Sequence, residues 1–184
     1  MVYDKEIIGT NVILRSVTRE DAQFILDMRL DSAKNAFVHR VDDDLNQEIR
    51  WIEAQRERAG DYFFSIISRK NTTQVGTISI YEINQAMNHA ELGRWISYGT
   101  AVENLESAIL AHDFAFDVLD LDTVFTKTIQ DNVKVVNFWK RFGGEGEDDK
   151  DVGEFTVYYN VVSKGEFKKN IRNRFAGLLE GKYD

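Results

Sequence analysis

Two glutamates carry the clearest candidate chemistry in this sequence. Glu82 and Glu91 fall in segments 74–83 and 89–98, which are predicted as adjacent central strands. A carboxylate inside a sheet is costly unless it is solvated, paired or used in a reaction. Burial would raise its pKa toward neutral pH, where it can accept a proton as a general base. Each is therefore a candidate catalytic base, and the alternative is a solvent-facing glutamate or one paired with Arg94.

The three histidines offer a rival base but no metal site. The imidazole pKa of His89 suits proton transfer, and His39 lies in the loop after the first predicted helix. His112 falls inside a predicted helix and is expected to be structural. The three are scattered without the spacing of metal ligands, so no metal is expected. The sequence contains no Cys, which excludes disulfides, thiolate metal sites and Cys nucleophiles.

Length, composition and charge narrow the class of protein. The 184 residues are 43% hydrophobic, enough for one domain over 1–184, with 164–184 as a basic C-terminal helix or tail. A formal net charge of −8 argues against nucleic acid as the main partner. No run of about 18 apolar residues indicates a membrane span, and the charged N-terminus does not resemble a signal peptide. The cytoplasm is the expected location.

The candidate residues belong to an alternating series of strands and helices. Segment 145–153 is acidic and glycine-rich and is predicted as a loop. The order fits an α/β fold in which a single mixed sheet carries helices on both faces. The predicted strands are 9–17, 62–68, 74–83, 89–98, 121–129 and 155–162, and the predicted helices begin near 18, 44, 104, 132 and 164.

The segment 130–144 is the most specific motif. Its apolar residues recur at helical spacing, with Asp131 as a possible N-cap and Gly143 or Gly144 as the stop. Together with the strand before it, this helix resembles the C-terminal half of a GCN5-related N-acetyltransferase (GNAT). Segments 75–81 and 90–96 resemble two further family motifs.

The resemblance extends over nearly the whole chain. It is strongest to the branch that contains ribosomal-protein alanine acetyltransferases and nucleotide-amino-sugar N-acetyltransferases. It implies a mostly antiparallel sheet of about six or seven strands. It also implies transfer of an acetyl group from acetyl-CoA to a primary amine by direct attack in a ternary complex.

The resemblance implies where coenzyme A binds. Backbone near Ile96 and Ser97, at the end of a bulged strand, would stabilise the oxyanion. The family's phosphate loop has paired glycines, which segment 97–108 lacks, and Glu103 places a negative charge there. The implied contacts are Ile96, Ser97, Val102, Asn104, Leu105, Asn132 and Trp139.

One position departs from the family mechanism. A Tyr often follows the family's Asn by seven residues and acts as the general acid, but here that residue is Trp139. An indole cannot donate a proton as a phenol can. Either the thiolate leaves without a protein acid, or water, Tyr98 or Tyr81 supplies the proton. Trp139 would pack in the core or line the cofactor channel.

The resemblance also implies an acceptor pocket at the first two helices. Its candidates are Arg29, Phe37, His39, Trp51 and Tyr81. We expect a nucleotide-linked amino sugar, whose phosphates Arg29, His39, Arg40 or Arg50 would hold. A protein N-terminus is the alternative, since an acidic protein attracts a basic ribosomal tail. A non-catalytic acyl-CoA-binding regulatory domain also stays open, as does a homodimer.

Overall fold

The computed structural model of the chain describes residues 1–37 and 41–179. These residues form one eight-stranded sheet in the order β1-β2-β3-β4-β5-β6-β8-β7. The pair β5–β6 is parallel and the other neighbours are antiparallel, which confirms the predicted mixed, mostly antiparallel sheet. The strands are β1 (Ile7–Ile8), β2 (Val12–Ser16), β3 (Tyr62–Ser68), β4 (Gln74–Asn84), β5 (His89–Ser97), β6 (Thr123–Ile129), β7 (Glu145–Val152) and β8 (Phe155–Ser163).

The sheet has more strands than the six or seven predicted because of its two edges. The strand β1 is only two residues long. The strand β7 occupies the acidic segment predicted as a loop, so that prediction was wrong. It pairs with β8 from Glu145 opposite Val161 to Val152 opposite Phe155, and most of its side chains are exposed. Charged residues are common on edge strands, and they hide the alternation that marks a half-buried strand.

The helices follow the predicted order. Asp44 caps α2 by accepting a hydrogen bond from the Gln47 N–H, as the sequence predicted. The helix α3 begins three residues earlier than predicted, because Thr100 is its N-cap. The helical segments are η1 (Arg19–Asp21), α1 (Ala22–Leu30), η2 (Asn35–Phe37), α2 (Leu45–Glu57), α3 (Ala101–Asp113), η3 (Phe114–Val118), α4 (Val133–Phe142), α5 (Lys164–Glu166), η4 (Phe167–Ile171) and α6 (Arg172–Leu179).

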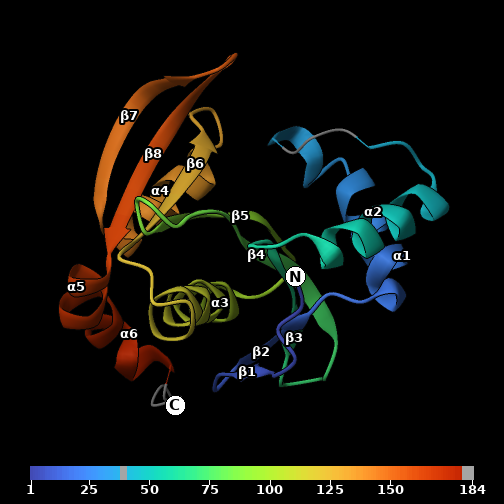
Figure 1. The fold of residues 1–184 in the computed structure, drawn as a ribbon, viewed down its shortest axis with the longest axis horizontal. Coiled ribbons are helices and arrows are strands. Elements are labelled where there is room, and N and C mark those ends of the chain that lie inside the picture. Colours follow the sequence, from blue (N-terminus) through green and yellow to red (C-terminus); the bar gives the residue numbers. More distant parts are fainter. Residues whose placement is uncertain (38–40, 180–184) are drawn as a thin grey trace.

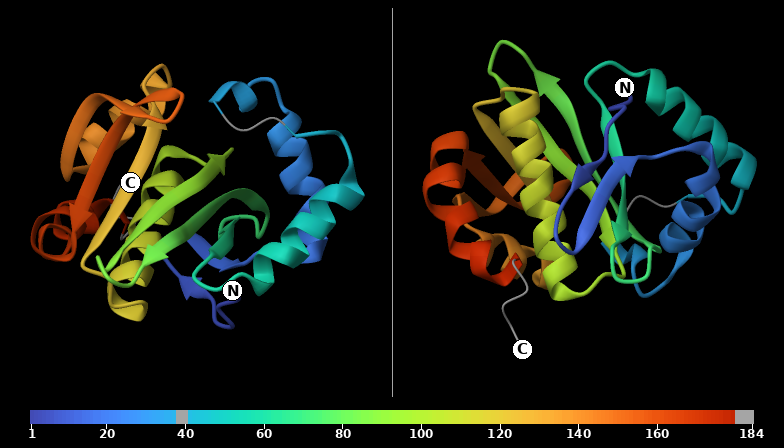
Figure 2. Two further views of the ribbon diagram at one scale, coloured as in Figure 1. Left: turned by 45° about the horizontal axis from the view of Figure 1, so that its top comes forward. Right: turned by 90° about the horizontal axis from the view of Figure 1, so that it is seen from below.

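Helices cover both faces of the sheet (Figures 1 and 2). Successive residues of β3 show this: Phe63 packs edge-on against Trp51 of α2, and Phe64 packs against Phe114, which follows α3. The larger core lies on the α3 side and includes Trp139 of α4. A smaller cluster lies under α1 and α2. Among the residues that the structure describes, none of the helices has the length and apolar character needed to cross a membrane.

The strand β5 changes course in the middle of the sheet. It pairs with β6 only from His89 to Glu91. Further along, Gly93 lies opposite Ser79 whereas Ile96 lies opposite Thr77, so β5 carries an extra residue. Arg94 sits in this bulge with a φ of 47°, a left-handed conformation that is uncommon outside glycine. The bulge turns β5 at the point where its pairing with β6 has ended.

Candidate active site

A cavity of about 390 Å³ lies between the first two helices and strands β3 to β5. It brings together four of the five residues predicted to bind the acceptor. Ile96, predicted at the cofactor, lines it as well. His39 lies outside the described residues. The residues that line the cavity include Arg29, Phe37, Trp51, Tyr81, Arg94 and Ile96.

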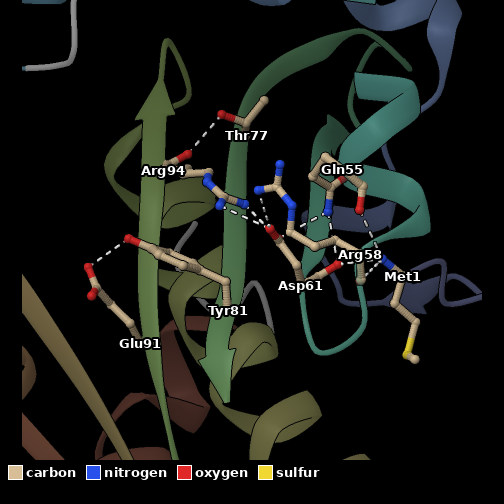
Figure 3. Close-up of polar contacts among 8 residues, drawn as sticks. All are labelled: Met1, Gln55, Arg58, Asp61, Thr77, Tyr81, Glu91 and Arg94. Atoms are coloured by element: carbon tan, nitrogen blue, oxygen red, sulfur yellow. Dashed lines mark hydrogen bonds and ion pairs between the residues drawn. The ribbon is translucent and has the colours of Figure 1, made fainter. Parts of the chain in front are cut away.

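An ion pair that was not predicted from the sequence organises this cavity. Both terminal nitrogens of Arg94 bind the carboxylate of Asp61, at 2.6 and 3.0 Å (Figure 3). Asp61 is buried just before β3 and also accepts a hydrogen bond from the amide of Gln55. The guanidinium carbon lies 4.2 Å from the ring centre of Tyr81 and 5.4 Å from that of Trp51. A bidentate pair flanked by aromatic faces fixes this charge in the cavity wall.

The predicted base Glu91 is buried and fully engaged. The Tyr81 hydroxyl donates to its Oε1 at 2.6 Å, and Lys127 Nζ lies 2.6 Å from its Oε2. Its partner is therefore Lys127, because Arg94 pairs with Asp61. Glu82 is 59% exposed and touches the same lysine at 3.5 Å. Of Tyr81, Glu82, Glu91 and Lys127, Tyr81 is the one that lines the cavity. The catalytic roles of both glutamates stay predictions.

Burial and neighbouring charges determine the protonation states of Tyr81 and Lys127. Burial raises the pKa of Tyr81 above its ordinary value, and the negative charge of Glu91 adds to the effect. Burial opposes the charge on Lys127, but the hydrogen bond and attraction of Glu91 outweigh it and raise the pKa of Lys127. Tyr81 is therefore a protonated hydrogen-bond donor and Lys127 a cation at neutral pH.

Gly93 explains how the phenol reaches its position. A Cβ at this residue would lie 2.7 Å from the Tyr81 hydroxyl oxygen, closer than real Cβ contacts come. The ring therefore crosses β5 directly over the glycine. This places the hydroxyl between Glu91, where pairing with β6 ends, and the bulge at Arg94.

The resemblance places the coenzyme A phosphates at the start of α3. There, side chains of this segment already accept hydrogen bonds from backbone N–H groups. Glu103 Oε2 accepts hydrogen bonds from the Thr100 N–H and hydroxyl, at 2.8 and 2.9 Å. The Ser97 hydroxyl accepts from the Gly99 N–H at 2.8 Å, and the Ser97 carbonyl accepts from Lys34 Nζ at 2.8 Å. Glu103 thus acts as a capping residue, and it occupies one N–H that a phosphate would otherwise meet.

Two buried polar atoms near the end of β5 fit a polar acyl carrier such as acetyl-CoA. Trp95 follows the bulge, and its indole Nε1 has no partner among the described residues. Asn104 donates to the Gly99 carbonyl, but its Oδ1 is also buried without a partner there. Val102 and Leu105, predicted with Asn104, share the first turns of α3. One unpaired donor and one unpaired acceptor match a chain with amide carbonyls and N–H groups.

The two α4 residues predicted at the cofactor have structural partners. Asn132, rather than Asp131, is the N-cap, and it accepts from the Val135 N–H at 3.5 Å. Trp139 is 2% exposed and its ring centre lies 5.3 Å from that of Trp95. The interpretation of Trp139 as a core packing residue is therefore supported. A role for either residue in binding the cofactor stays a prediction.

Comparisons with solved structures support the same fold. A nucleotide-linked sugar GNAT, FdhC, superposes with a TM-score of 0.83 at 22% identity, over 96% of this chain and 99% of that one. A GCN5-related N-acetyltransferase from Brucella melitensis gives 0.82 at 16% identity, over 99% of this chain and 89% of that one. A Vibrio cholerae protein assigned as a ribosomal-protein-serine acetyltransferase gives 0.71 at 23% identity, over 89% and 99%.

Comparison with protein families settles the membership. No curated protein sequence matches the chain. The family described as acetyltransferase (GNAT) domain matches residues 11–145, most of the chain. The protein therefore belongs to the GNAT acetyltransferase family.

Proposed function

We propose that this acyl-CoA-dependent N-acetyltransferase acetylates the primary amine of a nucleotide-linked amino sugar. The observation that carries the proposal is the cavity beside the β5 bulge, whose walls hold aromatic rings and the guanidinium of Arg29. Aromatic side chains stack on the apolar faces of sugar rings, and arginine binds phosphate. The likeness to a nucleotide-linked sugar GNAT over nearly the full length of both chains supports the same acceptor class.

Different residues of this chain position the acceptor, stabilise the oxyanion and accept the proton. Acetyl-CoA supplies the activated acetyl group when bound. Trp51, Phe37 and Arg29 hold the acceptor so that its amine faces the β5 bulge, since positioning alone provides a large share of such rates. Backbone N–H groups near Ile96 stabilise the negative charge that develops on the acetyl oxygen. Glu91 takes up the amine proton.

A protein N-terminus is the second candidate, and a different observation favours it. A neighbouring cavity of about 330 Å³ shares Arg29 and Trp51 with the first, and it is also lined by Asp42, Asp44 and Glu48. Burial raises the pKa of Glu48, whose Oε1 has no partner among the described residues. The exposed carboxylates of Asp42 and Asp44 suit a basic peptide.

A release assay for the free thiol of coenzyme A separates these classes. The panel contains acetyl-CoA with UDP- and dTDP-linked amino sugars, and with Ala- and Ser-initiated basic peptides. We expect turnover on a sugar nucleotide and little on either peptide. Faster turnover on a peptide would transfer the proposal to the second candidate. Tight acetyl-CoA binding without turnover on any amine would instead support a regulatory acyl-CoA-binding role.

A further inference from the structure

We propose that the Tyr81 hydroxyl, rather than Glu91 itself, contacts the acceptor amine and relays its proton to Glu91. The inference rests on the proposed function only in requiring an amine acceptor in the cavity. It assigns to Tyr81 the relay of the amine proton to Glu91, whereas the sequence predicted a substrate contact and offered Tyr81 as one candidate general acid.

Tyr81, and not Glu91, has access to the cavity. Glu91 is only 6% exposed, and its two oxygens are taken by Tyr81 and Lys127 at 2.6 Å each. Tyr81 lines the cavity and Glu91 does not. A proton that leaves an amine in the cavity therefore reaches Glu91 through the phenol.

The phenol of Tyr81 is held at a defined position along β5. The hydroxyl lies over Gly93, beyond the last pairing with β6 and just before the bulge at Arg94. The Arg94 guanidinium carbon lies 4.2 Å from the ring centre, and the guanidinium is itself fixed by Asp61. The Tyr81 ring thus lies between Gly93, which has no side chain, and the guanidinium of Arg94. Its O–H bond is therefore oriented before the substrate binds.

The proton balance is simple. The amine enters neutral, the N–C bond to the acetyl carbon forms, and the C–S bond breaks with its electron pair on sulfur. The nitrogen loses one proton to the Tyr81 oxygen while the original phenol proton moves to Glu91 Oε1. Tyr81 ends as it began, and Glu91 holds one proton. Glu91 then returns this proton through Tyr81 to the released thiolate or to water.

Three variants test the relay. Tyr81→Phe removes the hydroxyl and keeps the ring, and Glu91→Gln keeps the shape and removes the proton acceptor. We expect each to lower kcat roughly 10²-fold with little change in the acceptor KM. The double variant should be about as slow as either single variant, because groups that act as one unit are not additive. Independent losses that multiply would overturn the relay.

Gly93→Ala adds a test that keeps the phenol. The new Cβ would displace the hydroxyl, and the end of a Tyr side chain can move without unfolding the strand. We expect a loss of kcat similar to that of Tyr81→Phe. A kcat near wild type in either variant would overturn the proposal.

Controls separate the relay from a structural role and from the choice of acceptor. Tyr159→Phe, on β8 and outside the cavity lining, should leave kcat unchanged. Calorimetric binding of acetyl-CoA should match wild type in the test variants, and kcat is measured below the melting transition of each variant. Weaker binding in step with kcat would indicate a structural role and contradict the relay. If wild type acetylates peptides but not amino sugars, the proposed acceptor fails, and the same variants test the relay on the peptide.

Discussion

Lowering the pH should destabilise this protein through a single buried histidine. His112 is fully buried on α3, among the rings of Phe116, Trp139, Phe142 and Phe167. Its Nδ1 donates to the Ala108 carbonyl at 2.7 Å, and its Nε2 is buried without a partner in the described structure. Burial lowers the pKa of His112 to about 4 from a usual 6.5. The folded protein therefore holds the ring neutral under conditions where the unfolded chain protonates it.

The size of the effect follows from linkage. Because the unfolded chain binds the extra proton, unfolding becomes easier as the pH falls below 6.5, and the loss levels off below pH 4. At about 1.4 kcal/mol per pKa unit, the free energy of unfolding should drop by about 2 kcal/mol between pH 7.5 and pH 5, and by about 3 kcal/mol at pH 4.

Urea denaturation of wild type and His112→Leu at pH 7.5 and pH 5 measures this term. Leucine fills an apolar site without titrating, so the variant should lose less stability than wild type on acidification, by about 2 kcal/mol. Carboxylates titrate in both proteins and cancel in the comparison. Equal losses in the two proteins would refute the reasoning, because His112 would then be protonated in the folded state or be exposed.

Three further substitutions test other parts of the structure. Glu106→Ala should lower the free energy of unfolding by about 3 kcal/mol in urea, because this buried carboxylate accepts the N–H groups of residues 10–12; a loss below about 1 kcal/mol would contradict this. Trp139→Phe should lower the melting temperature with kcat nearly unchanged, and a large loss of kcat with an intact fold would show that Trp139 shapes the site. Asp61→Ala should raise the acceptor KM more than the Kd for acetyl-CoA, because it releases Arg94; equal effects on both would count against this role.

Local signals predicted most of the fold. The bounds of the largely buried strands β3 and β4 were predicted to within one residue. The strand β7 was missed because pairing with β8, rather than its own composition, makes it a strand. The cap of α4 was placed one residue early because Asp131 and Asn132 are equally good caps in sequence, and only the backbone conformation selects Asn132.

Individual residues of the candidate site could be predicted from the sequence. Contacts between residues that lie far apart in the sequence could not. Resemblance pointed to Tyr81 and Trp51, which line the cavity. The pair of Arg94 with Asp61 joins residues 33 positions apart and could not be found from either alone. One signal was present: a charged residue within a predicted central strand needs a partner.

Mass spectrometry of the acceptor tests the central claim most directly. A UDP- or dTDP-linked amino sugar is incubated with acetyl-CoA and the wild-type protein, with the Tyr81→Phe variant in parallel. The proposal predicts one acetyl group on the sugar amine, with one coenzyme A released per product, and far slower product formation by the variant. Unmodified sugar beside an acetylated peptide N-terminus under the same conditions would contradict the proposed acceptor.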